Sequence, residues 1–342
     1  MQEARRKNII YSIILLGSIA VVWLYRNYFS PPPAPEKVAI IGTTMGTTYS
    51  IKYLNDQGLN LKNSIDSLLE VYNQSLSTYI PNSEISQFNN NTLIKFELPY
   101  FYPVLEASKE VFKKTGGAFD PTVMPLVNAW GFGPEDRAIP DSNWVDSLRA
   151  LVSFDSLFYD SISICKLKEG VQLDFSAIAK GNAVDVVIDF LREKGLQDMF
   201  VEIGGEIAAY GNNETGSPWA VYIEKPKADT LQAMITVRLD NKAIATSGNY
   251  RNFYISDGKK YAHTISPFTG YPVEHSLLSA SVFADNCTTA DAYATAFMVL
   301  GLEAAQKVLS ENPEIDGYLI YSDKDGTLKS FVTEGIESDI VN

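Results

Sequence analysis

The run 171–181 places an acidic and a basic side chain on either side of an expected helix start. Apolar and polar residues alternate over 171–175, which predicts a short strand, and Ser176 is a good N-cap for a following helix. Asp174 and Lys180 flank the opening turn, where free backbone N–H groups favour anions. The expected start of this helix could bind a phosphate together with a metal ion. An ordinary helix cap explains the same residues.

A second helix is expected over 288–300, with Thr288 as its cap and Gly301 as its stop. Asp291 and Thr295 are four residues apart, so their side chains lie on one face of that helix. A carboxylate and a hydroxyl suit a hard cation that keeps its other positions for water and substrate phosphate. The alternative is an acidic residue favoured by the helix dipole beside a threonine bonded to its own backbone.

His263 is one of only two histidines and lies in a strand that runs into a turn containing Pro267 and Gly270. A histidine in this position is a candidate general base for a hydroxyl nucleophile. The alternative is a strand histidine bonded to the turn. We treat the other histidine, His275, as structural.

The elements that must position these residues are a few helices and many short strands. Apolar spacing predicts helices over 61–76 and 104–112, and one that starts at Ser176 and buries Ala179, Ala183, Val184, Val187, Ile188 and Leu191. A strand interrupted at 45–48 is expected over 38–53. Further strands are expected over 199–204, 206–210, 219–223, 234–239, 242–246, 250–255, 260–265 and 278–284. We expect polar loops over 82–91 and 131–160.

Most connections between these strands are too short for parallel crossovers, so the strands should pair antiparallel. The expected fold class is therefore α+β, with helices packed on largely antiparallel sheets, and not a doubly wound nucleotide-binding fold. Gly204 and Gly205 interrupt one strand pair, either as a bulge or as a close backbone approach to a ligand.

The first 30 residues have the pattern of a membrane anchor. Eighteen uncharged residues, 8–25, follow Arg5, Arg6 and Lys7, which is just long enough to span a bilayer as a helix. The basic residues place the N-terminus in the cytoplasm and the rest of the chain on the extracytoplasmic, periplasmic side of the inner membrane. A cleaved signal peptide is the alternative, but the apolar run is long and no small-x-small site follows it.

Charge and cysteine content exclude some classes of protein. The net charge of the chain is −13, and residues 1–30 carry +3, so the remainder carries −16. This disfavours nucleic acid as a partner. Cys165 and Cys287 are the only cysteines, which excludes a disulfide framework and leaves open whether the two pair.

Several short motifs occur in an order that resembles one protein family. They are Met45-Gly46-Thr47, Ser77-Thr78-Tyr79, Gly117-Ala118-Phe119-Asp120-Pro121, Asp174 through Lys180-Gly181, Gly204-Gly205, Ser247-Gly248-Asn249-Tyr250, His263 through Gly270-Tyr271-Pro272, and Thr289-Ala290-Asp291 through Thr295. Together they resemble the ApbE family of flavin transferases, which move FMN from FAD onto a threonine of a target protein. The resemblance covers about 38–332, and the expected domains are an anchor over 1–30, a proline-rich linker over 31–37 and a flavin transferase domain over 38–338.

The resemblance implies roles for individual residues. It implies an FAD site lined by Met45, Tyr79, Ala118, Phe119, Asp120, Asp174, Lys180 and Ile265. It implies Mg²⁺ held by the Ala177 carbonyl, the Asp291 carboxylate and the Thr295 hydroxyl. Ser266 and Glu202 depart from the residues usual in the family at those positions.

We expect a threonine hydroxyl to attack the FMN-side phosphorus of FAD with loss of AMP. His263 would take the proton, Lys180 would supply fixed positive charge, and Asp174 is the alternative proton acceptor. The acceptor implied by the resemblance is an extracytoplasmic subunit of a membrane redox complex, such as a sodium-pumping quinone reductase. The alternatives are hydrolysis of FAD to FMN and AMP, and a flavin-binding or electron-carrying protein without transfer activity.

Overall fold

An eight-stranded sheet forms the centre of the computed structural model, which describes residues 2–28, 36–56, 58–134, 140–224, 234–249, 253–256 and 259–341. In spatial order its strands are β1 (Glu36–Thr44), β2 (Thr47–Asn55), β6 (Met199–Ile203), β7 (Glu206–Tyr210), β10 (Lys242–Gly248), β13 (Leu277–Ala284), β14 (Asp316–Ser322) and β15 (Leu328–Val332). Every neighbouring pair is antiparallel. The expected α+β class with antiparallel sheets is confirmed.

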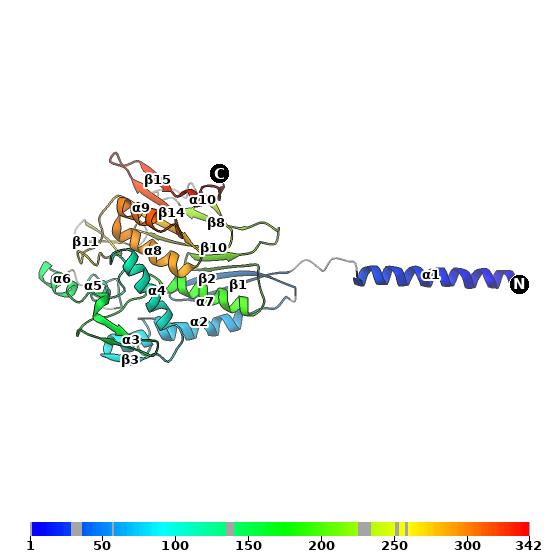
Figure 1. The fold of residues 1–342 in the computed structure, drawn as a ribbon, viewed down its shortest axis with the longest axis horizontal. Helices are drawn as coiled ribbons and strands as arrows, with labels where there is room; N and C mark the ends of the chain where they lie inside the picture. Colours follow the sequence, from blue (N-terminus) through cyan, green and yellow to red (C-terminus); the bar gives the residue numbers. More distant parts are fainter. Residues whose placement is uncertain are drawn as a thin grey trace.

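Helices cover one face of this sheet and form the larger core with it (Figure 1). They are α2 (Lys62–Leu76), α4 (Phe101–Lys114), α7 (Ala179–Glu193), α8 (Cys287–Leu300) and α9 (Leu302–Glu311). The alternation of β2 turns Tyr49, Ile51 and Tyr53 toward these helices, and all three are buried. The predicted apolar face of α7 is buried at every position named from the sequence. Hydrophobic spacing therefore identified the buried faces of β2 and α7.

A smaller sheet covers the opposite face. It consists of β16 (Ile340–Val341), β9 (Met234–Leu239) and β8 (Trp219–Glu224), and α10 (Glu334–Glu337) packs beside it. Trp219, Val221 and Ile223 alternate inward from β8 and pack on Phe200 and Phe283 of the central sheet. The exposed alternate positions of β8 include Tyr222. Three layers result: small sheet, central sheet and helices.

The expectation of polar loops over 82–91 and 131–160 was wrong. The first contains α3 (Glu84–Asn90), capped by Ser83, whose hydroxyl accepts the N–H of Ser86 at 3.2 Å. The second contains α6 (Ser142–Arg149), anchored by the fully buried Val145, and residues 135–139 lie outside the described chain. The remaining short elements are β3 (Leu93–Lys95), α5 (Met124–Ala129), η1 (Phe154–Ser156), β4 (Leu157–Tyr159), β5 (Ser163–Lys166), β11 (Phe253–Ser256) and β12 (Lys259–Ala262).

The two helix starts singled out from the sequence also differ in detail. The strand expected over 171–175 does not form. The helix starts at Ala179 because Asp174 accepts both the N–H and the hydroxyl of Ser176, which closes a separate turn. Helix α8 begins at Cys287, and its cap is Asn286, which accepts the N–H of Thr289 at 2.8 Å. Thr288 is therefore inside the helix and not its cap.

The N-terminal helix α1 (Gln2–Tyr28) contains an apolar segment, Arg5–Arg26, of 22 residues with a mean hydropathy of 2.0. None of its most apolar stretch is buried against other parts of the described chain. Its length and composition fit either a membrane anchor or a signal sequence.

Two segments with sequence predictions lie outside the described residues. They are 29–35, which include most of the expected proline-rich linker, and 250–252, which include the first residues of an expected strand. Both cysteines are free thiols.

Candidate active site

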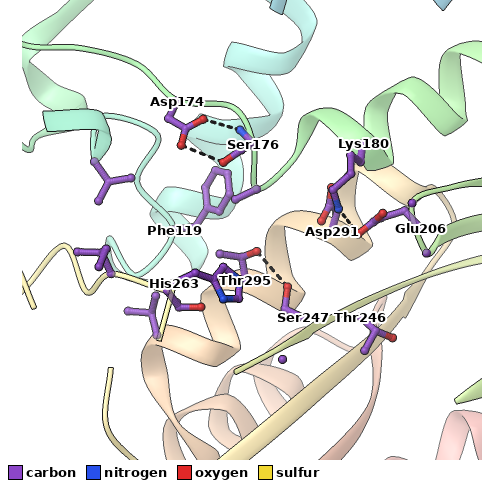
Figure 2. A pocket seen from close by; sticks show the side chains of 18 of the residues that line it. Phe119, Asp174, Ser176, Lys180, Glu206, Thr246, Ser247, His263, Asp291 and Thr295 are labelled. Atoms are coloured by element: carbon purple, nitrogen blue, oxygen red, sulfur yellow. Dashed lines mark hydrogen bonds and ion pairs between the residues drawn. The ribbon is translucent and has the colours of Figure 1, made fainter. Parts of the chain in front are cut away.

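A cavity of about 750 Å³ opens where the start of α7, the middle of α8 and the β6–β7 turn meet. The end of β10, the outer part of β8, the loop 118–123 and the segment after β12 complete its wall. This volume lies within the range of about 300 to 1,000 Å³ typical of small-molecule sites. Figure 2 shows that its polar side chains come from segments far apart in the sequence.

Ten of the twelve residues selected from the sequence line this cavity. They are Ala118, Phe119, Asp120, Asp174, Ala177, Lys180, His263, Ile265, Asp291 and Thr295. Met45 lies instead at the β1–β2 turn, which forms a separate small hollow, and the Tyr79 side chain is 70% exposed. The structure thus gathers the predicted metal ligands and proton acceptors, while the flavin-binding roles of Met45 and Tyr79 stay predictions.

The predicted metal-binding pair lies on α8 and faces the start of α7. Asp291 is 3% exposed, and its Oδ2 accepts the backbone N–H of Gly181 at 2.9 Å. Within the described chain, no residue donates a hydrogen bond to its Oδ1. The Thr295 and Ser247 hydroxyl oxygens are 3.2 Å apart. Burial raises the pKa of Asp291 against the opposing effects of Lys180 and the Gly181 N–H, and a bound cation would favour the ionised form.

Two features hold α7 and α8 close together. A Cβ atom on Gly181 would lie 2.3 Å from the carbonyl oxygen of Cys287 and 2.7 Å from Cβ of Asp291. Asp185, on the next turn of α7, accepts the N–H groups of Cys287 at 2.8 Å and Thr288 at 2.7 Å. The glycine permits the close approach, and the aspartate binds the free N–H groups at the start of α8.

Gly181→Ala is therefore expected to destabilise the fold by about 1 to 3 kcal/mol, the usual cost of overpacking. The methyl group has no space without moving backbone atoms of α8, although alanine is itself a better helix former than glycine. Thermal or denaturant unfolding would measure the loss. Gly17→Ala is the control, because Gly17 also lies inside a helix, α1, and a Cβ added there has nothing within 4 Å. An unchanged unfolding midpoint for Gly181→Ala would contradict the close approach.

Lys180, the second residue of α7, forms an ion pair with Glu206, the first residue of β7. The Glu206 side chain is 5% exposed, and its Oε2 is buried without a hydrogen-bond partner among the described residues. Burial lowers the pKa of Lys180, but the carboxylates of Asp291 and Glu206 outweigh it, so the net shift is upward. The lysine therefore stays charged between two buried carboxyl groups.

Two further carboxyl groups in the wall are held by neighbouring serine and threonine groups. Asp174 accepts the Ser176 N–H at 2.8 Å and its hydroxyl at 2.9 Å, and burial raises the pKa of Asp174. Asp120 accepts the Thr122 N–H at 2.8 Å and its hydroxyl at 2.6 Å, and burial raises the pKa of Asp120 to about 6. These bonds fix the direction of both side chains.

His263 enters the cavity from the segment that follows β12 (Figure 2). Its ring packs edge-to-face on Phe132, with 6.5 Å between the ring centres. It is half-buried and lines the same cavity as Thr295 and Asp291. This position is compatible with proton transfer at the predicted metal site.

The charges of the cavity wall fit a bound cation. Among the described residues, six carboxyl groups line the cavity, from Asp120, Asp174, Glu202, Glu206, Glu224 and Asp291, against one lysine. A diphosphate would be repelled by this wall unless a divalent cation accompanied it. In the described ranges no three His, Cys, Asp or Glu side chains gather as a metal-binding group, and the predicted ligand set contains only one such side chain, Asp291.

Sequence reasoning missed some polar groups of the wall. Ser247 belongs to a quoted motif and Glu206 directly follows one, but neither was selected as a site residue. Tyr222 and Glu224 come from a strand with no motif. A glutamate directly after two glycines was the available signal for Glu206. Nothing in the local sequence indicated that β8 reaches the cavity.

Comparisons with known proteins identify the family of this chain. The model of the ApbE family matches residues 45–319. Proteins named FAD:protein FMN transferase from Vibrio cholerae and Haemophilus influenzae are 40% and 38% identical, over 85% and 94% of this chain and 89% and 95% of their own lengths. The solved structure of the flavin transferase ApbE from Vibrio cholerae matches with a TM-score of 0.82 and 38% identity, over 89% of this chain and 99% of its own. The chain therefore belongs to the ApbE family.

Proposed function

We propose that this enzyme transfers FMN from FAD to a threonine hydroxyl of a target protein, with Mg²⁺ in the site and AMP as the second product. FAD:protein FMN transfer is the activity named for its curated relatives at up to 40% identity. The threonine acceptor, the metal and the leaving group are the finer parts of the proposal.

One observation carries these finer parts: the buried Asp291 carboxylate lies in an acidic cavity with Thr295 and Lys180. A carboxylate, a hydroxyl and a backbone carbonyl, that of Ala177, are the oxygen donors that Mg²⁺ prefers. The cavity also has the volume for a dinucleotide. A protein that only bound flavin would have no use for a cation site beside the phosphates.

In the proposed reaction, the threonine oxygen forms a bond to the FMN-side phosphorus, and the bond from that phosphorus to the bridging oxygen breaks. AMP leaves with the bridging oxygen, and His263 accepts the threonine proton. Lys180 holds positive charge near the phosphates, and the fixed carboxyl groups of Asp120 and Asp174 orient the dinucleotide. Bound Mg²⁺ would supply electrostatic stabilisation of the charge that develops on the phosphate oxygens.

The proposal is tested by incubating the purified chain with FAD, Mg²⁺ and a candidate acceptor, then following acceptor mass and free AMP. A mass gain on the acceptor equal to FMN less one water, together with AMP, supports transfer. FMN and AMP without a mass gain indicate a hydrolase, and intact FAD indicates a binding protein. Replacement of the acceptor threonine by valine should prevent the mass gain, since valine has similar volume but no hydroxyl.

We further propose that the acceptor is an extracytoplasmic subunit of a membrane redox complex, for example a sodium-pumping quinone reductase or a related electron-transport complex. The support is the apolar helix α1 with its basic amino-terminal flank, which would place the catalytic domain on the periplasmic side of the inner membrane. A tethered enzyme would meet such a subunit at the membrane surface.

Deletion of residues 1–30 is expected to release a soluble enzyme that keeps its transfer activity, because α1 adds no buried contacts over its apolar stretch. Membrane fractionation and an activity assay of both forms would check this. Full-length protein recovered from the extracytoplasmic fluid, and shortened by about thirty residues, would show instead that the segment is a cleaved signal.

A further inference from the structure

We propose that Glu206 is a positioning residue that holds the Lys180 ammonium away from Asp291, so that the Asp291 carboxylate remains available to a divalent cation. This inference rests on the proposed function, because it concerns the same cation site. It assigns a task to a buried glutamate that the reaction itself does not use.

The first support is that Lys180 lies near two carboxylates and pairs with only one of them. Asp291 and Glu206 both act on the lysine charge, and in Figure 2 the three side chains lie together at the start of α7. Among the described residues, however, the ammonium forms its ion pair with Glu206 alone. Asp291 instead accepts the Gly181 N–H. The lysine therefore neighbours the predicted metal ligand without binding it.

The second support is the state of the Glu206 carboxyl group. One oxygen binds Lys180, and the other is buried and has no hydrogen-bond partner in the part of the chain that the structure describes. A buried ion pair of this kind rarely improves stability over apolar residues, because desolvation offsets the attraction. A contribution to stability therefore does not explain a glutamate at this position. Holding the neighbouring Lys180 ammonium in place does explain it.

The third support is the path of the lysine stem. A Cβ on Gly204 would lie 3.3 Å from Cδ of Lys180 and 2.8 Å from Cγ2 of Thr47. Gly204 also has a φ of 63°, which favours glycine. The β6–β7 turn thus leaves room for the stem and places Glu206 at its end.

Without the Glu206 charge, Asp291 becomes the nearest partner for the ammonium. A direct pair between Lys180 and Asp291 would have to break before a cation could bind, which weakens cation affinity. The same variant also removes a negative charge from the cavity, which weakens cation affinity in any arrangement. These two effects separate in a double-mutant cycle.

The experiment titrates Mn²⁺ into the full-length chain with FAD and no acceptor, and reads free Mn²⁺ by electron paramagnetic resonance. We expect Glu206→Gln to weaken Mn²⁺ binding roughly tenfold when Lys180 is present, and less than about twofold in a Lys180→Met background. An equal loss in both backgrounds would show a general charge effect and overturn the inference. No loss in the presence of Lys180 would overturn it too.

Two further variants sharpen the result. Glu206→Asp keeps the charge but shortens the side chain, so weakened Mn²⁺ binding supports positioning, and unchanged binding contradicts it. Glu202→Gln is the matched control, since Glu202 lines the same cavity but binds the Gly205 N–H and not Lys180. Its effect should be the same with and without Lys180. If the unmodified chain did not bind Mn²⁺, the proposed cation site itself would be wrong. If the unmodified chain bound Mn²⁺ and transferred FMN normally, but the effects of Glu206→Gln and Lys180→Met on Mn²⁺ affinity were additive, only the role of Glu206 would be wrong.

Discussion

Asp291→Asn is expected to abolish FMN transfer while the fold remains intact. The substitution keeps the size and shape of the side chain but removes the negative charge that the cation requires. The buried position of Asp291 leaves the cation little water to replace the lost ligand. A loss of at least about a hundredfold in rate, roughly 2.7 kcal/mol, is typical when one such electrostatic contact is removed. Transfer rates over a range of Mg²⁺ concentrations would measure it.

Asp189→Asn is the matched control for this variant. It also removes one negative charge, but from the neighbouring helix α7, and its side chain is 70% exposed and does not line the cavity. Its transfer rate should equal that of the unmodified enzyme. Thermal unfolding of both variants would exclude loss of the fold as the cause. If Asp291→Asn turned over normally at low Mg²⁺, the assignment of Asp291 as a metal ligand would be wrong.

Hydrophobic periodicity was sufficient to predict most of the fold. Alternation in β2 and the three-and-four spacing in α7 both correspond to buried faces, since each pattern describes one side of a regular element. The pattern failed for α3 and α6, which are short and largely polar. In α3 only Ile85 and Phe88 lie three residues apart and buried, so the cap at Ser83 was a better signal than periodicity.

The first residue of each of the helices α7 and α8 could not be predicted from the local sequence. Ser176 and Thr288 are both good caps by residue type. In the structure, Asp174 binds Ser176, and Asp185 from another helix binds Thr288. Whether a residue caps a helix depends on which groups its side chain bonds in the folded chain. Partners that come from other elements cannot be identified from the local sequence.

Ten of the residues that line the cavity could be selected from the sequence, but their arrangement in space could not be predicted. Asp291 was selected for its spacing to Thr295, yet its bond to the Gly181 N–H joins residues 110 positions apart. Glu206 was missed because a charged residue after a glycine turn usually faces solvent, and only tertiary packing buries it. Met45 and Tyr79 were selected through the family resemblance alone, and they lie outside the main cavity.

His263→Ala is expected to lower the rate of FMN transfer by ~10² to 10⁴, the range for loss of a general base. FAD binding should change little, because the proposed role of His263 is toward the incoming hydroxyl and not the dinucleotide. Single-turnover transfer at saturating FAD would measure the rate, and flavin fluorescence would measure binding. A rate loss with unchanged FAD affinity is the signature of a group that acts in the chemical step.

His275→Ala is the matched control, because His275 bonds the Met298 carbonyl oxygen at 2.7 Å and does not line the cavity. His275→Ala should affect the free energy of unfolding more strongly than the rate of FMN transfer. A loose phosphoryl transition state needs little proton removal from the nucleophile, so the effect of His263→Ala should fall near the lower end of its range. Full activity in His263→Ala would leave His263 a packing role against Phe132. The proton acceptor would then be sought at Asp174, whose carboxyl group lines the same cavity and whose pKa is raised by burial.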